Sequence, residues 1–384
     1  MRIASLLLIS LLLLPCVLTA QTATVSVKNP IDLTRKSETV VLGAAELRRT
    51  LNVVDVRKIH VRDSSGNELL TQAVDNNDDG TFDDYIFQTD IAPNATNTFT
   101  LTVGQRQVPK AADFKAYGRF VQERRDDFAW ENDRIAHRMY GKELETWPQE
   151  ALTSSGVDIW TKRTSRLVIN EWYMTDDYHH DHGDGADIYS VGKSRGCGGN
   201  GIYADGKLYP SANFVHSHTY ANGPVRVMFE LDYPAWSAAG VQVTEVKRIT
   251  LDAGQNLGRF ESHYKFQGDA KSLSGAIGIK QSAGSAENTS SESGTLRTWE
   301  AVKADGSEVG CAIVVAPGQL LNFAHADGNY LAVTKVPADG IVTYYAGFGW
   351  NKTGQFASDD DWDRYVADWA RKLQAPLQVT LTAK

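Results

Sequence analysis

The sequence is poor in cysteine, and it has no long apolar stretch after residue 20. Its cysteines are Cys16, Cys197 and Cys311, and the first lies in a segment that export would remove. The remaining pair cannot form the disulfide framework that holds small secreted domains together. Export permits one bridge between Cys197 and Cys311, and two buried free thiols account for the pair equally well. Without a second apolar stretch, we expect no membrane span in the rest of the chain.

The chain also lacks a basic block. Lys and Arg number 39 against 47 Asp and Glu, which gives a net charge of −8. This balance argues against nucleic acid or an anionic membrane surface as a partner. An acidic sugar stays compatible with it, because a local group of arginines can bind a carboxylate inside an acidic protein.

The N-terminus has the features of a secretory signal peptide. Arg2 is followed by the apolar run "IASLLLISLLLLPCVL", and small residues surround a cleavage point after Ala20. The run is too short for a comfortable membrane span. We therefore predict a signal peptide at residues 1–20 and a mature protein that is periplasmic or extracellular.

The rest of the chain is rich in short strand patterns. Residues 21–110 predict a small β domain, because brief alternating runs such as "TVSVKN" and "NTFTLTV" are separated by turn sequences. Residues 111–384 predict a large antiparallel β-sandwich, with strands that include "RLVINEWYM" (166–174) and "VRVMFELDY". One helix is expected after Ser358, where apolar residues recur at helical spacing behind a capping serine. The predicted class is all-β.

Histidines and aspartates are concentrated in "YHHDHGDGADIY" (178–189). The segment holds His179, His180 and His182 among three aspartates and two glycines. Histidine exchanges protons near neutral pH, and glycine allows tight turns and close approach of a ligand. The segment is therefore a candidate catalytic loop, and an exposed loop without function is the alternative.

Two cation sites can be proposed from spacing alone. His180 and His182 share one side of a strand, which is a spacing used by zinc ligands. The hairpin "DNNDDGTFDDYI" (75–86) matches the start of a calcium loop but ends in Ile86 instead of a glutamate. A divalent cation, Ca or Zn, is thus one hypothesis, and no cofactor follows with certainty.

Two further segments supply candidate sugar-binding groups. "ERRDDFAWENDRIAHRMYG" (123–141) places Arg138 and Tyr140 on one strand face, where Arg can bind a carboxylate and Tyr can protonate a leaving oxygen. "GVDIWTKRTSRL" (156–167) places Trp160 and Lys162 on one alternating face. Ion pairing between sheets is the structural alternative for both segments.

These segments, together with "ANGPVRVMFELDYPAW" (221–236), resemble a family of secreted bacterial domains of unknown function from polysaccharide-utilisation systems. One member of that family is described as an ulvan-oligosaccharide dehydratase. The resemblance covers roughly residues 25–384 and implies a galactose-mutarotase-like supersandwich. The family pattern Tyr-His-x-Asp-His-Gly-Glu-Gly-x-Asp maps onto Tyr178, His179, Asp181, His182, Gly183, Asp184, Gly185 and Asp187. Asp184 departs from it, since the pattern has Glu there.

The resemblance implies a carbohydrate lyase or dehydratase that performs β-elimination on uronic-acid-containing oligosaccharides. In this hypothesis His182 or His179 is the base and Tyr140 the acid, while Arg138 and Lys162 bind the substrate carboxylate. The predicted substrate-binding residues are Trp130, Trp160, Lys162, Asp184, Asp187 and Arg195. The alternatives are a sugar epimerase or mutarotase, a carbohydrate-binding protein without activity, and a metal-dependent hydrolase.

Overall fold

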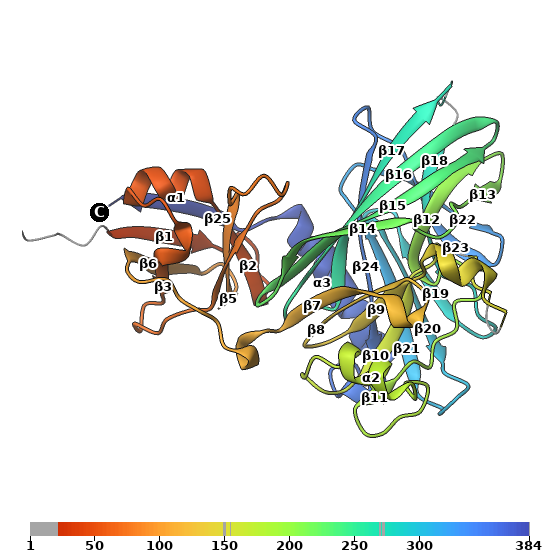
Figure 1. The fold of residues 1–384 in the computed structure, drawn as a ribbon, viewed down its shortest axis with the longest axis horizontal. Helices are drawn as coiled ribbons and strands as arrows, with labels where there is room; N and C mark the ends of the chain where they lie inside the picture. Colours follow the sequence, from red (N-terminus) through yellow and green to blue (C-terminus); the bar gives the residue numbers. More distant parts are fainter. Residues whose placement is uncertain (1–21, 149–150, 154, 269, 271–272, 384) are drawn as a thin grey trace, which may run out of the picture.

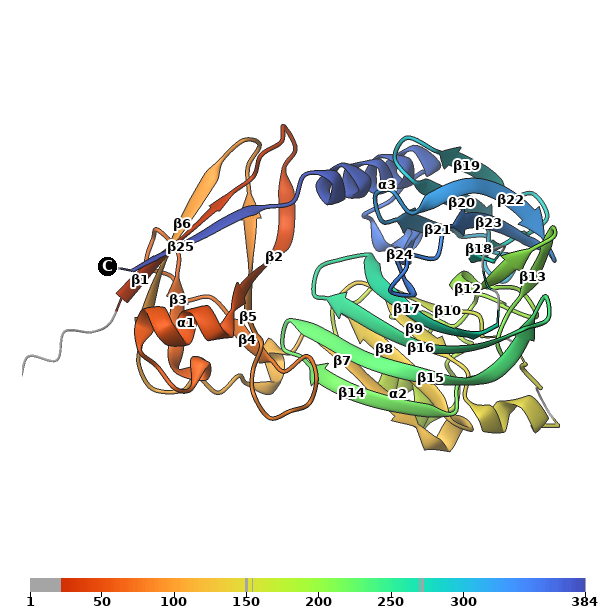
Figure 2. The same cartoon turned by 90° about the horizontal axis from the view of Figure 1, so that it is seen from above.

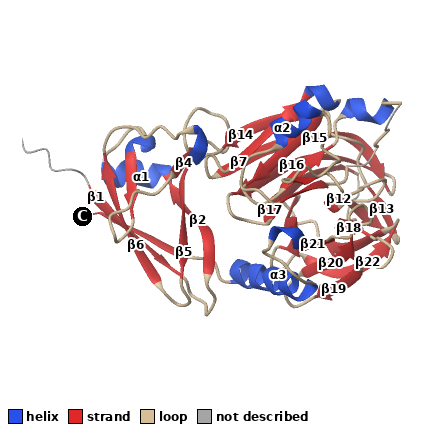
Figure 3. Ribbon diagram, turned by 90° about the horizontal axis from the view of Figure 1, so that it is seen from below, coloured by secondary structure: helices blue, strands red, loops and turns tan. Residues whose placement is uncertain are grey.

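The computed structural model describes residues 22–148, 151–153, 155–268, 270 and 273–383. Within this part of the chain, antiparallel strands dominate and α-helices are few (Figures 1 and 3). The predicted all-β class, with a small sandwich before a large one and a helix near the C-terminus, is confirmed. The predicted signal peptide at 1–20 lies outside the described residues. No helix in the described ranges is long and apolar enough to span a bilayer.

The N-terminal sandwich packs two sheets around one core. The first sheet has the order β25 (Gln378–Ala383), β1 (Thr22–Lys28), β6 (Thr96–Val103), β3 (Ile59–Arg62). The second has the order β2 (Arg35–Gly43), β5 (Asp84–Ile91), β4 (Thr71–Val74), and helix α1 (Ala44–Leu51) follows β2. Alternate side chains such as Val25, Phe87 and Leu101 fill the space between the sheets, as the period of two in these strands requires.

The last strand of the chain returns to the first domain. Strand β25 pairs antiparallel with β1, from Ala23 opposite Ala383 to Lys28 opposite Gln378. The sequence analysis assigned everything after residue 110 to the second domain, and this assignment is wrong for β25. Strand β6 pairs with only one edge of β1. Helix α3 (Asp359–Gln374) carries the chain back to the other edge, where β25 pairs (Figure 2).

The large sandwich consists of three sheets that share one core. The eight-stranded sheet has the order β14 (His216–Asn222), β15 (Arg226–Ala238), β16 (Val241–Asp252), β17 (Leu257–Gln267), β24 (Ile341–Trp350), β21 (Glu308–Val315), β20 (Thr295–Ala301), β19 (Ala286–Ser290). One five-stranded sheet has the order β13 (Lys207–Tyr209), β12 (Cys197–Ala204), β18 (Ser274–Lys280), β23 (Asn329–Thr334), β22 (Leu320–Ala326). The other has the order β11 (Gly185–Ala186), β10 (Asp158–Lys162), β9 (Ala136–Met139), β8 (Asp127–Asn132), β7 (Ala116–Val121). Their inward side chains, among them Trp130, Phe260 and Ile277, form a single buried cluster.

Of two helices of the large domain, one agrees with the sequence prediction and the other contradicts it. Helix α3 begins after Ser358, whose Oγ accepts a hydrogen bond from the amide of Asp361, as predicted. The segment 166–174, predicted as a strand, instead contains helix α2 (Ile169–Thr175). Its buried residues Ile169, Trp172 and Tyr173 recur at helical spacing, which the apolar run at the start of the segment concealed.

Glutamine side chains join the two domains. Gln72 accepts hydrogen bonds from the amides of Val225 and Arg226, both at 2.8 Å. Gln88 donates to the carbonyl of Ala253 at 2.8 Å, and Gln255 donates to the carbonyl of Ser37 at 2.7 Å. Because these bonds link β2, β4 and β5 to the ends of β15 and β16, they fix one domain against the other.

Candidate active site

The histidine-rich loop is folded by its own aspartate and glycines. Asp181 accepts hydrogen bonds from the amides of Gly183 and Gly185 and forms a two-point ion pair with Arg163 at 2.6 and 2.8 Å. Gly185 has φ +119°, and a Cβ there would lie 2.0 Å from the carbonyl oxygen of Thr161. The conformation and the close approach to β10 therefore both require glycine at 185.

Beneath this loop lies a buried charge network centred on Arg138. Its guanidinium donates to Asp158 at 2.8 Å and to Asp187 at 2.7 Å, and Asp127 lies 3.6 Å away. The Tyr140 hydroxyl donates to Asp158 at 3.1 Å. The structure thus brings together three predicted site residues, Arg138, Tyr140 and Asp187. It also shows that Arg138 is buried and surrounded by carboxylates, so its predicted role as a clamp for a substrate carboxylate is wrong.

Burial controls protonation in this network. Burial raises the pKa of Asp127 to about 7 despite the attraction of Arg138. It also raises the pKa of Tyr140 well above its ordinary value. A buried phenol that holds its proton so strongly and is closed to solvent cannot serve as the acid for a leaving group, which corrects the prediction for Tyr140.

His179 forms the solvent-facing end of the network. Its side chain is 58% exposed, and its Nδ1 lies 3.1 Å from the carbonyl oxygen of Asp187 and 3.5 Å from the carboxylate of the same residue. A carbonyl oxygen only accepts hydrogen bonds, so Nδ1 carries the proton in the neutral imidazole. The lone pair is then on Nε2, where an imidazole oriented by a backbone carbonyl can accept a proton as a general base.

The other two histidines of the loop share one partner. His182 Nε2 lies 2.8 Å from Asp177 and its side chain is 72% exposed, while His180 contacts the other oxygen of Asp177. These hydrogen bonds lower the pKa of Asp177. Asp177 is 47% exposed and is shared by two histidines. It therefore holds His182 less firmly than the buried network holds His179, which makes His182 the weaker candidate base.

Among the described residues, neither candidate metal site has a complete set of metal ligands. Within the described ranges, no group of three or more His, Cys, Asp or Glu side chains is placed to hold a metal ion. In the acidic hairpin, the carboxylate of Asp75 accepts hydrogen bonds from the amides of Asn77, Asp78 and Gly80. The carboxylate of Asp75 is therefore hydrogen-bonded by amides of the turn itself. Cys197 and Cys311 are buried and unbonded to each other.

Most predicted substrate-binding residues are inside the protein. Trp130 is fully buried and stacks on His137, and Trp160 stacks under Tyr178 at 4.9 Å. Lys162 is buried and donates to Glu131 at 2.6 Å and to two backbone carbonyls. Neither tryptophan can stack on a sugar, and Lys162 cannot bind one, so these three predictions are wrong. The cause is that β8 and β10 are covered on both faces, which alternation alone does not reveal.

Two other predicted binding residues differ in their exposure to solvent. Arg195 is buried and donates to the hydroxyl of Ser155 at 2.9 Å, so its predicted contact with substrate is also wrong. Asp184 is partly exposed and pairs with Arg166. It lies in the same loop as His179, where a ligand can reach it.

The sequence analysis missed a polar cluster inside the large sandwich. Asn200 donates to Glu245 at 2.8 Å, and the buried Lys247 lies 3.7 Å from Glu245 and 3.4 Å from the hydroxyl of Tyr233. Burial lowers the pKa of Lys247. The signal was present in β16, where Glu245 and Lys247 interrupt an otherwise apolar inward face. The cluster is closed to solvent, so we assign it no contact with substrate.

The loop geometry gives a prediction with a matched control. Gly183 and Gly185 both have positive φ, but a Cβ at Gly183 would meet nothing within 4 Å. Gly183→Ala should cost about 1–2 kcal/mol from backbone strain alone. Gly185→Ala should cost clearly more and should raise amide exchange over residues 178–187, measured by urea unfolding and hydrogen exchange. Equal effects of the two substitutions would contradict the proposed contact with β10.

Asp127 gives a prediction about pH. Its pKa is about 7 in the fold and 3.8 as the ordinary value, so between these values the folded state binds more protons than the unfolded state. Asp127 therefore makes stability fall as pH rises from about 4 to 7, by up to about 1.4 kcal/mol per pH unit. In urea unfolding, Asp127→Asn should become progressively more stable relative to wild type across this range. The exposed-site control Asp339→Asn should show no such trend; a flat difference for Asp127→Asn would refute the assignment.

Comparison with known proteins finds similarity over most of the chain. The family model described as a domain of unknown function (DUF4861) matches residues 27–379. The chain is 33% identical over 375 residues to "Uncharacterized protein P7" of Formosa agariphila, covering 93% of each chain.

The fold is also similar to that of solved structures. An α-mannosidase from Enterococcus faecalis aligns with a TM-score of 0.52 and 11% identity over 94% of this chain and 46% of that one. A protein in glycosyl hydrolase family 38 from the same organism aligns with a TM-score of 0.53 and 11% identity, over 94% and 47%. The present chain thus spans about half the length of these structures, and at such identity the likeness concerns the fold alone. By the match over residues 27–379, the chain belongs to the DUF4861 family.

Proposed function

We propose that this protein is an exported carbohydrate-active enzyme that uses His179 as a general base on an oligosaccharide containing uronic acid. The carrying observation is the exposed imidazole whose Nδ1 donates to the carbonyl oxygen of Asp187, which leaves Nε2 to accept a proton. The fold shared with glycosidases supports a sugar substrate. The proposed reaction is β-elimination, as in the ulvan-oligosaccharide dehydratase that the motifs resemble.

In the proposed reaction, Nε2 of His179 removes the proton on the carbon next to the carboxylate. The electron pair of that C–H bond forms a carbon–carbon double bond while the bond to the β-oxygen breaks, and that oxygen leaves with a proton from water. Negative charge builds on the carboxylate side during this step, so a nearby cation lowers the barrier.

Because Arg138 is not available, the cation must come from the surface of the loop. Arg166 is 55% exposed and pairs with Glu171 at 2.9 Å and with Asp184. Exposed ion pairs of this kind contribute about 0–1 kcal/mol, so a substrate carboxylate can replace one of the partners. Arg166 is therefore the proposed carboxylate-binding group, and Asp184 would accept hydrogen bonds from sugar hydroxyls after the exchange.

The base assignment is tested by replacing one histidine at a time. His179→Ala should lower the rate of elimination at least 100-fold, since a positioned base contributes about 10²–10⁴. His180→Ala should leave the rate near wild type, because His180 is 77% exposed and contacts Asp177 outside the buried network. The rate is followed as ultraviolet absorbance of the unsaturated sugar, with uronic-acid oligosaccharides as substrates.

The product identifies the reaction class. Mass spectrometry should show loss of water from the oligosaccharide, or two fragments of which one is unsaturated. An epimerase would leave the mass unchanged and produce no absorbance, and that result would overturn elimination while keeping His179 as base. Wild-type elimination in His179→Ala would remove His179 from the mechanism.

A further inference from the structure

A cavity separate from the histidine loop lies between the two domains. It has a volume of about 690 Å³ and is lined by β2, by the outward residues of β15, β16, β17 and β24, by α3 and by the segment leading to β25. No residue of the loop 178–187 lines it. Ligand sites often occupy such positions between domains, and this volume lies within their usual range.

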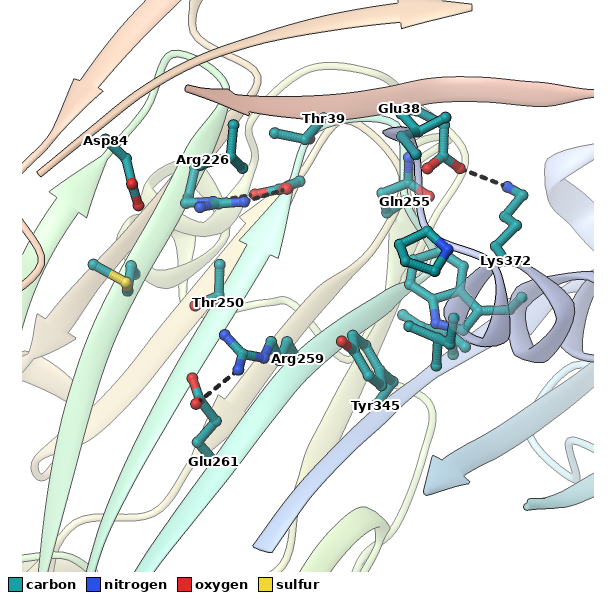
Figure 4. A pocket seen from close by; sticks show the side chains of 18 of the residues that line it. Glu38, Thr39, Asp84, Arg226, Thr250, Gln255, Arg259, Glu261, Tyr345 and Lys372 are labelled. Atoms are coloured by element: carbon teal, nitrogen blue, oxygen red, sulfur yellow. Dashed lines mark hydrogen bonds and ion pairs between the residues drawn. The ribbon is translucent and has the colours of Figure 1, made fainter. Parts of the chain in front are cut away.

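Most charged groups of the cavity are arranged in pairs (Figure 4). Arg226 forms a two-point ion pair with Asp252 at 2.6 and 2.8 Å. Arg259 donates to Glu261 at 2.8 Å, and Lys372 lies 2.9 Å from Glu38. Each pair keeps unused donor and acceptor positions, since a guanidinium has five N–H groups and a carboxylate about four lone-pair sites. A charged ligand would have to break a pair, whereas a neutral ligand with many hydroxyls can bind to both partners at once.

One side of the cavity is aromatic and apolar. The rings of Tyr345 and Trp369 lie 6.0 Å apart, and Leu257 and Leu373 line the cavity with them. Burial raises the pKa of Tyr345, so its hydroxyl stays neutral. Half-buried aromatic rings offer a flat apolar surface with a polar edge. A pyranose ring has the complementary form, with C–H groups on its faces and hydroxyls around its rim.

We infer that the cavity between the domains is a binding site for a neutral, hydroxyl-rich oligosaccharide, separate from the site at His179. The ligand would stack on the Tyr345 and Trp369 side and exchange hydrogen bonds with the neighbouring paired charges. The inference depends on the proposed function only in taking carbohydrate as the common ligand class. An enzyme that acts on a long mixed chain would thereby hold neutral residues of the chain while it reacts at uronic-acid residues.

The site is held in place before any ligand arrives. The glutamine hydrogen bonds between the domains fix β2 against the ends of β15 and β16, and the pair of Lys372 with Glu38 ties α3 to β2 across the cavity. A site that is ordered in advance loses less entropy on binding. The walls therefore need no rearrangement to receive a sugar.

The test is a binding measurement on the full-length mature protein. Isothermal titration with neutral probes (mannan, xylan, galactan and glucan hexasaccharides) should detect at least one ligand. Tyr345→Ala should weaken its affinity at least tenfold, which corresponds to about 1.4 kcal/mol. Glu261→Gln, which keeps the side-chain volume, should weaken it to a smaller extent. The control Tyr203→Ala removes a half-buried tyrosine from β12, outside the cavity, and should leave the affinity unchanged.

Two further outcomes decide the nature of the ligand. Binding should be nearly the same at 50 and 500 mM salt (about a tenfold range), because the charges stay paired; a steep loss with salt would mean an anionic ligand and would overturn the inference. Failure of all neutral probes to bind would overturn it as well. His179→Ala should still bind the neutral ligand, and Tyr345→Ala should still turn over short acidic substrates. Loss of turnover in His179→Ala alone therefore concerns the proposed function, and loss of neutral binding in Tyr345→Ala alone concerns the cavity.

Discussion

A single guanidinium organises the region around the histidine loop. Arg138 extends from β9 and contacts Asp127 on β8, Asp158 on β10 and Asp187 in the loop. A buried charge is tolerated only with close partners, and removal of one partner of such a pair costs about 3–5 kcal/mol. The carboxylate of Asp187 must therefore stay on Arg138, and its carbonyl orients the imidazole of His179. The exposed imidazole of His179 therefore owes its position to a buried ion pair.

The sequence predicted where strands and helices lie better than it predicted which of their faces meet solvent. The period of two in the strands and the capped apolar stripe of α3 identified both sandwiches and the terminal helix, because each element carries its own pattern. Which side of a strand meets solvent depends on what packs against it, so Trp130 and Lys162 were mistaken for cleft residues. The return of β25 to β1 depends on an unpaired edge far away in sequence, which no local pattern records.

The histidine loop also combines a local feature that the sequence indicates with long-range contacts that it does not. Its glycines and Asp181 could be identified as a tight turn from residue types alone, and the structure shows the hydrogen bonds and the contact with β10 that require them. The three histidines look equivalent in sequence. They differ only because Asp187 is anchored by Arg138 while Asp177 lies at the surface. This distinction comes from long-range packing, so it could not be predicted.

The separation of His179 from the cavity between the domains is consistent with the charge of the protein. With a net charge of −8, the long-range field opposes the approach of an acidic oligosaccharide, and this repulsion acts over about 8–10 Å at moderate salt. Near the histidine loop, Arg163 and Arg166 are both paired with carboxylates, so they add little positive charge at long range. A neutral stretch of the same polysaccharide feels little of the repulsion, so a cavity of paired charges could hold the chain first. The uronic acid would then reach His179 at the high local concentration that a tethered ligand has.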